Sequence, residues 1–582
     1  MTRNDTLIRR KFYQYLLPGV LMVIAMQLGN VVDSMFVGHA LNYNAVSAIS
    51  LSIPALYVMQ FPPFLLGAGG AAVAAVAFGK QQIEKASRVY TLCLAVGLAV
   101  SFVPVVLAPV LCHPLAQWMA SSEELAALLE PYLLVYILGN PVLTLAIEFS
   151  YFISMDNHPK LGSGLFIIAN IVNLILDYVF LFHTSLGMYG SALSTILGYA
   201  AGLAVLLPYL RSNTRLLHLT SLAKAKLAEL WEASRAGLSS AMYLLASGAN
   251  LLLLNSLILR TLGQNQMAYF SVCRSSCLLV ELVVGGILGL IPTIAGILYG
   301  EKDFYGLRKL SERVMKSASL AVLLLIAIFW LFPSAIANLF GIYDPEMLRV
   351  MNVCLQLYSL SFLPYVIDKF LQNYYQATLF ASLATTGALM QRFLAIAPIS
   401  ILLMFCFGIY GVCIAPLLAE LLTVAAVSAV RIAGQKKGTF PQKGVLMIPE
   451  KDQSVYIDCS ILGAPEEITD ASRQMVDFCE QNGISKRDSM AVGLAVEEIC
   501  VNIMKYGYTK KPDCIDICLS HSENRLILRI RDDGPVFDSV AYSRQENADP
   551  MGGICLITGM ASQFKYLRTL NFNNTIIEIN LQ

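Results

Sequence analysis

The chain has 582 residues, of which 57% are hydrophobic and only 14% are Asp, Glu, Lys or Arg. Together with a mean hydropathy of +0.63, this composition excludes a disordered, fibrous or disulfide-rich secreted protein and is typical of a membrane protein. The 40 basic and 39 acidic residues almost cancel, so no overall basic excess indicates a nucleic-acid partner. Thirteen cysteines lie scattered without a CxxC pair, which argues against a disulfide framework or a zinc site.

The charged residues divide the chain into two parts. Residues 1–435 contain 43 charged side chains, whereas the much shorter segment 454–582 contains 30, close to the one-quarter that is usual for a soluble domain. The segment 436–453 between them is rich in Gly, Pro and Lys, which is typical of a linker. We therefore expect a membrane part followed by a soluble domain.

Apolar stretches long enough to cross a bilayer as helices occur twelve times in the membrane part. They lie roughly at 15–37, 46–78, 88–112, 131–153, 161–183, 190–211, 233–261, 267–299, 317–341, 352–378, 383–406 and 410–433. Counted together with Arg88, Arg211, Arg235 and Arg260 at the span ends, the N-terminus, the even-numbered connections and the tail carry 22 Lys and Arg, whereas the odd-numbered connections carry 2. The positive-inside rule then places both termini in the cytoplasm of a multi-pass protein of the plasma or inner membrane.

A weak internal repeat joins the two halves of the membrane part. Gly187-Met-Tyr-Gly190 recurs as Gly408-Ile-Tyr-Gly411, and Phe78-Gly-Lys80 corresponds to Tyr299-Gly-Glu301, both at the same offset in the sequence. Six-helix repeats begin and end on the same side of the membrane, so the two lobes should be parallel, at 1–222 and 223–435. In such transporters the substrate path runs between the lobes.

Nine charged residues lie inside the predicted spans away from the span ends, where each is costly and therefore a candidate for function. They are Asp33, Glu148, Asp177, Arg274, Glu281, Asp368, Lys369, Arg392 and Glu420. Six acids against three bases favour an interior that handles cations. Asn173 and Asp177 are four apart in the sequence and share one helix face. Two neighbouring carboxylates, such as Asp33 and Asp177, could exchange a proton or Na⁺, although the alternative is a hydrogen-bonded packing pair.

Residues 10–433 resemble the multidrug and toxic compound extrusion (MATE) family of transporters. The likeness rests on motifs in both halves: Asn30-x-x-Asp33-x-x-Phe-Val-Gly38, Ala77-Phe-Gly-Lys80, Asn173-Leu-Ile-Leu-Asp177, Gly187-x-x-Gly190-Ser-Ala192, Pro292 and Tyr299-Gly-Glu-Lys302. The resemblance implies an ion site in the N-terminal lobe formed by Asp33, Asn173, Asp177 and Thr195. In a second subgroup, acids of the C-terminal lobe bind Na⁺. Glu281 and Asp368 are candidates for that role, but Asp368 could instead pair with Lys369 or Arg392.

The soluble domain is predicted as a helix layer on an antiparallel or mixed sheet. We expect strands at 454–461, 514–520, 525–532, 563–569 and 574–581, and helices at 464–482, 485–506 and 553–561. The loop of about 20 residues before the third helix is long enough to suggest a functional lid.

Three short motifs surround that loop. Glu498 and Asn502 are four apart on one helix, so the amide could hold Mg²⁺ while the acid orients a nucleophile. Asp532-Asp-Gly534 ends a strand, where a carboxylate can accept a hydrogen bond from an exocyclic amine. Gly552-Gly553 opens a helix, whose free N–H groups favour phosphate. Each motif is weak alone, because Asp-Asp-Gly is also an ordinary turn.

In this order, the three motifs resemble the GHKL (Bergerat) ATP-binding fold, and specifically the serine kinases of the anti-sigma-factor type. The resemblance implies that Asn502 binds Mg²⁺, Glu498 is the general base and Asp532 reads adenine with Gly534 beside it. It further implies that Gly552 and Gly553 line the phosphates, and that Thr575 corresponds to the family's terminal Thr. An anti-anti-sigma-like protein would then be a partner, and protein-serine kinase activity stays open.

The leading interpretation is a secondary transporter in the lipid bilayer that exports amphipathic, cationic compounds by proton or Na⁺ antiport, with ATP and Mg²⁺ bound by a regulatory domain. No GxxxxGK[ST] sequence is present, so we do not expect ATP to drive transport. The alternative is a membrane-tethered signalling protein whose transporter fold senses a ligand and controls the kinase. A lipid-linked sugar flippase is a third possibility, against which the acidic interior argues.

Overall fold

A computed structural model describes residues 2–41, 43–120, 122–212, 215–340, 342–440, 444–448, 456–507, 514–522, 524–543 and 553–581. For some residues within helices, including 25–34, only the backbone is described. The chain forms two compact units, residues 14–447 and residues 1–13 together with 448–582. Residues 1–13 therefore belong with the C-terminal domain, whereas the sequence assigned them to the first lobe.

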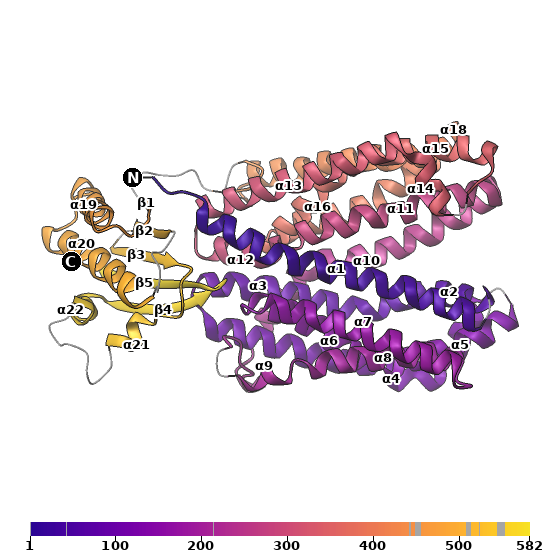
Figure 1. The fold of residues 1–582 in the computed structure, drawn as a ribbon, viewed down its shortest axis with the longest axis horizontal. Coiled ribbons are helices and arrows are strands. Elements are labelled where there is room, and N and C mark those ends of the chain that lie inside the picture. Colours follow the sequence, from indigo (N-terminus) through magenta and orange to yellow (C-terminus); the bar gives the residue numbers. More distant parts are fainter. Residues whose placement is uncertain are drawn as a thin grey trace. The chain divides into compact units, whose positions relative to one another are not determined.

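The membrane unit consists of helices that run roughly alongside one another (Figure 1). In the first half they are α1 (Thr6–Ala40), α2 (Tyr43–Pro63), the π-helical turn η1 (Phe64–Ala68), α3 (Gly69–Gly79), α4 (Ile83–Met119), α5 (Glu123–Leu138), α6 (Asn140–Met155), α7 (Pro159–Phe182), α8 (Met188–Ala204), α9 (Leu207–Arg211) and the 3-10 turn η2 (Leu222–Lys224). In the second half they are α10 (Leu227–Thr261), α11 (Gln264–Leu288), α12 (Ile291–Gly300), α13 (Phe304–Leu331), α14 (Pro333–Leu339), α15 (Pro345–Ser359), α16 (Phe362–Ala377), α17 (Ala381–Leu389), the π-helical turn η3 (Met390–Leu394) and α18 (Ile396–Lys436).

Nine helices of the described chain are long and apolar enough to cross a membrane, or ten if the bent pair α5 and α6 forms one span. Two features explain why this number is below twelve. The last of the nine runs from Ala381 to Lys436 and contains a kink at Gly408, so that it covers two predicted spans. The helix α1, which covers the first predicted span, is not among the nine. The count of twelve stays a prediction.

The backbone supports the internal repeat at the predicted offset. Gly187 has φ and ψ of 53° and −127°, and Gly408 has 60° and −136°, a left-handed region that favours glycine. Gln81 and Lys302, which are separated by the same offset, both have positive φ, at 60° and 59°. Conformations this rare, recurring at one offset, indicate that the two halves repeat one backbone design.

The two halves meet where their equivalent glycines touch. A Cβ atom on Gly79 of α3 would lie 2.2 Å from the carbonyl oxygen of Ile297, and one on Gly300 of α12 would lie 2.2 Å from that of Val76. Only glycine permits this backbone approach, because any side chain would overlap the facing helix. The small residues in α3 and α12 thus fix a close contact between the halves.

The C-terminal unit is a five-stranded antiparallel sheet with strand order β1-β2-β3-β5-β4. Its strands are β1 (Tyr456–Ile461), β2 (Ile515–Ser522), β3 (Arg525–Asp532), β4 (Gln563–Thr569) and β5 (Phe572–Asn580), and its helices are α19 (Pro465–Gln481), α20 (Lys486–Asn502), α21 (Ser539–Ser543) and α22 (Gly553–Met560). The predicted order of strands and long helices is confirmed. The predicted helix 485–506 differs, since α20 ends at Asn502 and a π-helical turn, η4 (Ile503–Gly507), follows.

The two faces of this sheet have different partners. Along β3, Leu526, Leu528 and Ile530 point to the same face and join the apolar core beneath α19 and α20, which lie on one side of the sheet (Figure 1). Asp532 continues that row, so its side chain belongs to the helix-covered face. Asp458 of β1 and Asp516 of β2 point to the opposite face, because they alternate along their strands with residues of the apolar core.

Candidate functional sites

Three of the four residues predicted for the N-terminal ion site lie together between α7 and α8. The Asn173 amide donates hydrogen bonds to the Ser194 hydroxyl at 3.2 Å and to the Thr195 hydroxyl at 3.3 Å. The Ser194 hydroxyl in turn donates to the Asp177 carboxylate, which is fully buried. Ser194 therefore links the amide and the acid, a role that the sequence assigned to no residue.

Close packing of the two helices makes this cluster possible. A Cβ atom on Gly198 of α8 would lie 2.4 Å from the carbonyl oxygen of Ala169 and 3.1 Å from the Asn173 Cβ atom. The glycine lets α8 approach α7 within reach of short serine and threonine side chains. The fourth predicted residue, Asp33, lies in the helical backbone of α1, but its side chain is outside the described residues.

The predicted acids of the C-terminal lobe have separate partners. Glu281 of α11 forms an ion pair with Arg392 at 3.2 Å. The Arg392 guanidinium lies 4.2 Å from the centre of the Tyr243 ring, and the Lys369 ammonium lies 3.9 Å from the same ring centre. An aromatic ring in contact with two cations offsets part of the cost of placing them in the membrane.

Asp368 pairs with neither base in the described structure, which corrects one expectation. Its buried carboxylate adjoins that of Glu420, which also accepts a 2.7 Å hydrogen bond from the Gln391 amide. The Gln372 amide extends this chain by donating to Gln391 at 2.7 Å. Two adjoining buried carboxylates repel each other unless a proton or a cation neutralises one of them, and the charges of Arg392 and Lys369 act on Glu420 as well.

Glu148 of α6 is a further buried acid. Its side chain lies against Gly97 of α4, and neither carboxylate oxygen has a hydrogen-bond partner among the described residues. An unpaired carboxylate in an apolar site is costly when it is charged, so this residue stays a candidate for proton exchange.

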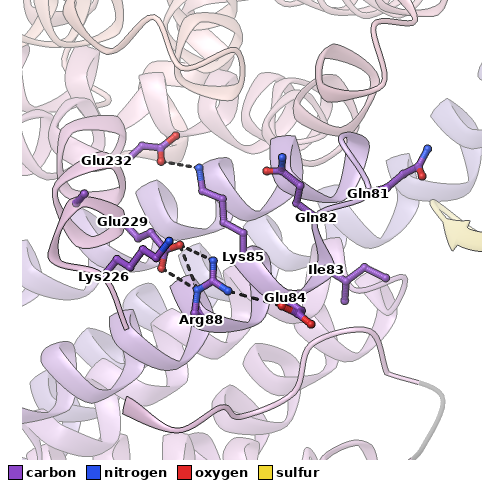
Figure 2. Close-up of a pocket in the computed structure, with 10 residues that line it drawn as sticks. Gln81, Gln82, Ile83, Glu84, Lys85, Arg88, Lys226, Glu229 and Glu232 are labelled. Carbon is purple, nitrogen blue, oxygen red and sulfur yellow. Dashed lines mark hydrogen bonds and ion pairs between the residues drawn. The ribbon is translucent and has the colours of Figure 1, made fainter. Parts of the chain in front are cut away.

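A charged cavity of about 710 Å³ opens beside the first turns of α4 and α10. Figure 2 shows Lys85 pointing toward Glu232 and Arg88 pointing toward Glu229. The first pair lies 2.8 Å apart, and the Arg88 guanidinium contacts both Glu229 oxygens, at 2.8 Å and 3.3 Å. Since α4 and α10 belong to different halves, these ion pairs join the halves at their predicted cytoplasmic ends.

In the C-terminal unit, α20 carries the predicted Mg²⁺ ligand and general base. The Asn502 amide nitrogen donates to the backbone carbonyl of Glu498 at 2.6 Å. This bond commits the nitrogen and leaves the amide oxygen as the atom suited to a Mg²⁺ ion, so the geometry fits the predicted ligand. The Glu498 side chain is half-buried on the same helix.

The predicted adenine-reading residue is held in one orientation. One oxygen of the buried Asp532 carboxylate accepts hydrogen bonds from the Gly534 backbone N–H at 2.8 Å and from the Asn573 amide at 2.9 Å. Asn573 lies opposite Asp532 in the register of β3 and β5 and also donates to the Pro535 carbonyl at 2.8 Å. A carboxylate fixed in this way fits recognition of an exocyclic amine.

Thr575 follows Asn573 by two positions along β5, opposite Ile530, and its hydroxyl is 3.2 Å from that of Ser539. It therefore shares a strand face with Asn573 next to Asp532. Gly553 begins α22, but only its backbone is described, and Gly552 lies outside the described residues. The predicted phosphate site is not described beyond that helix start.

Two different family models match the two units of the chain. The family model described as MatE matches residues 18–179 and 240–386. The chain belongs to the MatE family. A second model, described as a histidine kinase-like ATPase domain, matches residues 462–579. The chain is thus a MatE protein fused to an ATPase-like domain, as the motifs predicted.

Two multidrug export proteins are similar to this MatE protein over most of its length. The multidrug export protein MepA of Staphylococcus haemolyticus is 24% identical over 431 residues, which cover 74% of this chain and 94% of that protein. MepA of Staphylococcus aureus strain MRSA252 is 24% identical over 417 residues, 70% of this chain and 90% of that protein.

Solved transporters share the fold of the MatE unit. The MATE multidrug transporter DinF-BH has a TM-score of 0.68 at 22% identity, covering 74% of this chain and 97% of that one. A mutant of the Vibrio cholerae MATE transporter VcmN has a TM-score of 0.69 at 18% identity, covering 76% and 99%. The predicted fold class of the membrane unit is confirmed.

Proposed function

We propose that the membrane unit exports amphipathic, cationic compounds across the plasma membrane in exchange for H⁺ or Na⁺. The C-terminal domain binds Mg²⁺-ATP in the cytoplasm and regulates that export. Both termini lie in the cytoplasm, and an anti-anti-sigma-like protein is the class of partner that the domain would engage. The likeness to multidrug export proteins named MepA supports the transport part of this proposal.

The observation that carries the proposal is the Asp177 cluster. A carboxylate buried in the membrane is costly when it is charged, and Asp177 is fully buried where the Ser194 hydroxyl donates to it. A proton, a Na⁺ ion or a cationic substrate would each neutralise the acid. Competition between the ion and the substrate for one acid couples their movements in opposite directions, which is antiport.

Neighbouring polar groups would make the site selective. The hydroxyls of Ser194 and Thr195 and the carbonyl oxygen of Ser191 form one connected set, because both hydroxyls contact that carbonyl, at 2.7 Å and 3.2 Å. Oxygen ligands of this kind suit a small hard cation. The Asp368–Glu420 pair offers a second place for a cation in the other half.

The ATPase-like domain is proposed as a regulator because the chain has no phosphate-binding loop of the type that drives pumps. In our assignment Asn502 holds Mg²⁺ and Asp532 binds adenine. The hydrogen bond of each side chain to the nearby backbone supports these roles. When bound, ATP would supply a transferable phosphate. Glu498 is the residue placed to accept a proton from a hydroxyl nucleophile.

The test is efflux of ethidium from proteoliposomes without ATP under imposed pH or Na⁺ gradients. Asp177→Asn should lower gradient-driven efflux about tenfold or more, since losing a charged hydrogen-bond partner costs about 1.5–3 kcal/mol. Glu312→Gln is the matched control, because that carboxylate lies on the surface of α13 and pairs with Lys309. Wild-type efflux in Asp177→Asn would refute the assigned coupling site. Folded wild-type protein with no efflux under any gradient would favour the sensor function.

A further inference from the structure

The start of the chain packs on the face of the C-terminal sheet that faces away from α19 and α20. We call residues 2–13 the N-terminal arm. The arm belongs to the same compact unit as the C-terminal domain, although the arm and the domain lie at opposite ends of the sequence. Leu7, Ile8 and Phe12 of the arm are almost fully buried. The arm is therefore part of the packed structure of the ATPase-like domain.

A buried arginine anchors the start of the arm. The Arg3 guanidinium lies 3.1 Å from the Asp516 carboxylate of β2 and 3.7 Å from Asp458 of β1, and none of the three side chains is more than 3% exposed. Ser460 of β1 completes the cluster by donating to Asp516 at 2.6 Å. A charge this deeply buried is stable only with its partners, so the anchor is specific to this docked position.

Asn4 ties the anchor to the start of α1. Its backbone N–H donates to the Ser460 hydroxyl at 3.0 Å, and its side-chain oxygen accepts from the Thr6 backbone N–H at 3.0 Å. The same oxygen accepts from the Cys514 thiol at 3.4 Å. Asn4 therefore forms an Asx turn just before α1 and fastens the start of the helix to the sheet.

Two basic residues connect the next turns of α1 to the edge of the predicted nucleotide site. Arg10 forms a 3.1 Å ion pair with Asp533, the residue that follows Asp532. The Lys11 ammonium lies 4.6 Å from the centre of the Phe572 ring and 3.4 Å from the Asn571 carbonyl oxygen. Burial lowers the pKa of Lys11 to about 8, although the nearby Asp533 carboxylate acts in the opposite direction.

These contacts flank the residues that orient Asp532. Phe572 precedes Asn573, whose amide holds the Asp532 carboxylate, and Asp533 separates Asp532 from Gly534. The arm thus contacts Asp533, which follows Asp532, and Phe572, which precedes Asn573. A change at Asp532 on nucleotide binding would act on the arm through Asp533 and Phe572.

We propose that the N-terminal arm transmits the nucleotide state of the ATPase-like domain to the part of helix α1 that belongs to the membrane unit. The helix continues past Tyr13 into the membrane unit and carries Asp33. Helix α1 is then common to the nucleotide site and the ion or substrate site. Binding at either site can change how stably the arm is docked on the sheet. This inference rests on the proposed function, since it needs a nucleotide in the domain and a cation in the membrane unit.

The docked position can be trapped by a disulfide in the full-length protein. Asn4→Cys places a thiol beside native Cys514, and mild oxidation with copper phenanthroline should link the two. Arg9→Cys is the control, because the Arg9 side chain is exposed and should not link to Cys514. The linked peptides are identified by mass spectrometry. Failure of Asn4→Cys to link, in protein that stays monodisperse, would overturn the docking.

The coupling is measured as the effect of a transported cation on nucleotide affinity. In wild-type protein in nanodiscs, saturating tetraphenylphosphonium should change the Kd of trinitrophenyl-ATP about fivefold, at the low end of typical coupling. Arg10→Glu should abolish that change, and Arg10→Gln should reduce it as a milder second variant. The double variant Arg10→Glu/Asp533→Arg should restore it by reversing the ion pair. Arg9→Glu is the matched control and should behave as wild type.

The outcomes separate this inference from the proposed function. Equal nucleotide affinity with and without the cation in wild type, or an unchanged ratio in Arg10→Glu, would overturn the coupling through the arm. Gradient-driven ethidium efflux measured on the same preparations reports the transport function independently. Efflux that persists while the cation has no effect on nucleotide affinity would refute only the coupling through the arm. Absence of both efflux and coupling in the wild type would count against the transporter assignment itself.

Discussion

Replacing Asp532 by asparagine will weaken ATP binding to the full-length protein about tenfold or more. The carboxylate accepts two hydrogen bonds, from Gly534 and Asn573, and in our assignment it also accepts one from adenine. An amide can present only one acceptor oxygen, and hydrogen bonds to charged groups contribute about 1.5–3 kcal/mol. Isothermal titration with Mg²⁺-ATP measures the change.

The control for this variant is Asp470→Asn, which removes an exposed carboxylate from α19 in the same domain. Its nucleotide affinity should match that of the wild type. Thermal unfolding of both variants separates loss of binding from loss of folding. Unchanged affinity in folded Asp532→Asn would contradict the adenine assignment and would leave the ATPase-like domain without its proposed ligand contact.

Replacing Gly79 by alanine will destabilise the membrane unit by about 1–3 kcal/mol or more, because overpacking forces backbone shifts. The new Cβ atom would lie 2.2 Å from the Ile297 carbonyl oxygen, a distance that no relaxation of side chains can relieve. Gly300→Ala should have the same effect from the opposite helix, since its Cβ atom meets the Val76 carbonyl oxygen.

Gly164→Ala is the matched control, because a Cβ atom on this glycine of α7 meets no atom within 4 Å. The melting temperature in detergent, followed by intrinsic fluorescence, should fall for both Gly79→Ala and Gly300→Ala and should not fall for Gly164→Ala. Wild-type stability in both interface variants would contradict the close contact between the halves.

Local patterns in the sequence account for much of the fold. Alternation in β3 and the apolar stripe of α19 depend on near neighbours in the chain, so their positions could be predicted within a few residues. The constant offset of the repeat also predicted which glycines are equivalent, and Gly187 and Gly408 share the same unusual conformation. The Asn173–Asp177 spacing placed two site residues on one helix face.

Partners far apart in the sequence could not be predicted in this way. Adjacent Lys369 suggested a partner for Asp368, but helix neighbours in sequence point in different directions, and the acid instead meets Glu420 of another helix. Docking of Arg3 on Asp516 depends on the folded sheet and leaves no periodic signal in the sequence. Ser194 was missed because Thr195 beside it already matched the family pattern.

The measurement that tests the central claim most directly is ethidium efflux by wild-type protein in proteoliposomes, with an ion gradient alone and with Mg²⁺-ATP alone. The account predicts efflux under a pH or Na⁺ gradient without nucleotide and no efflux with Mg²⁺-ATP in the absence of a gradient. Efflux driven by Mg²⁺-ATP alone would contradict it, because the ATPase-like domain would then power transport and the Asp177 cluster would not couple it to an ion.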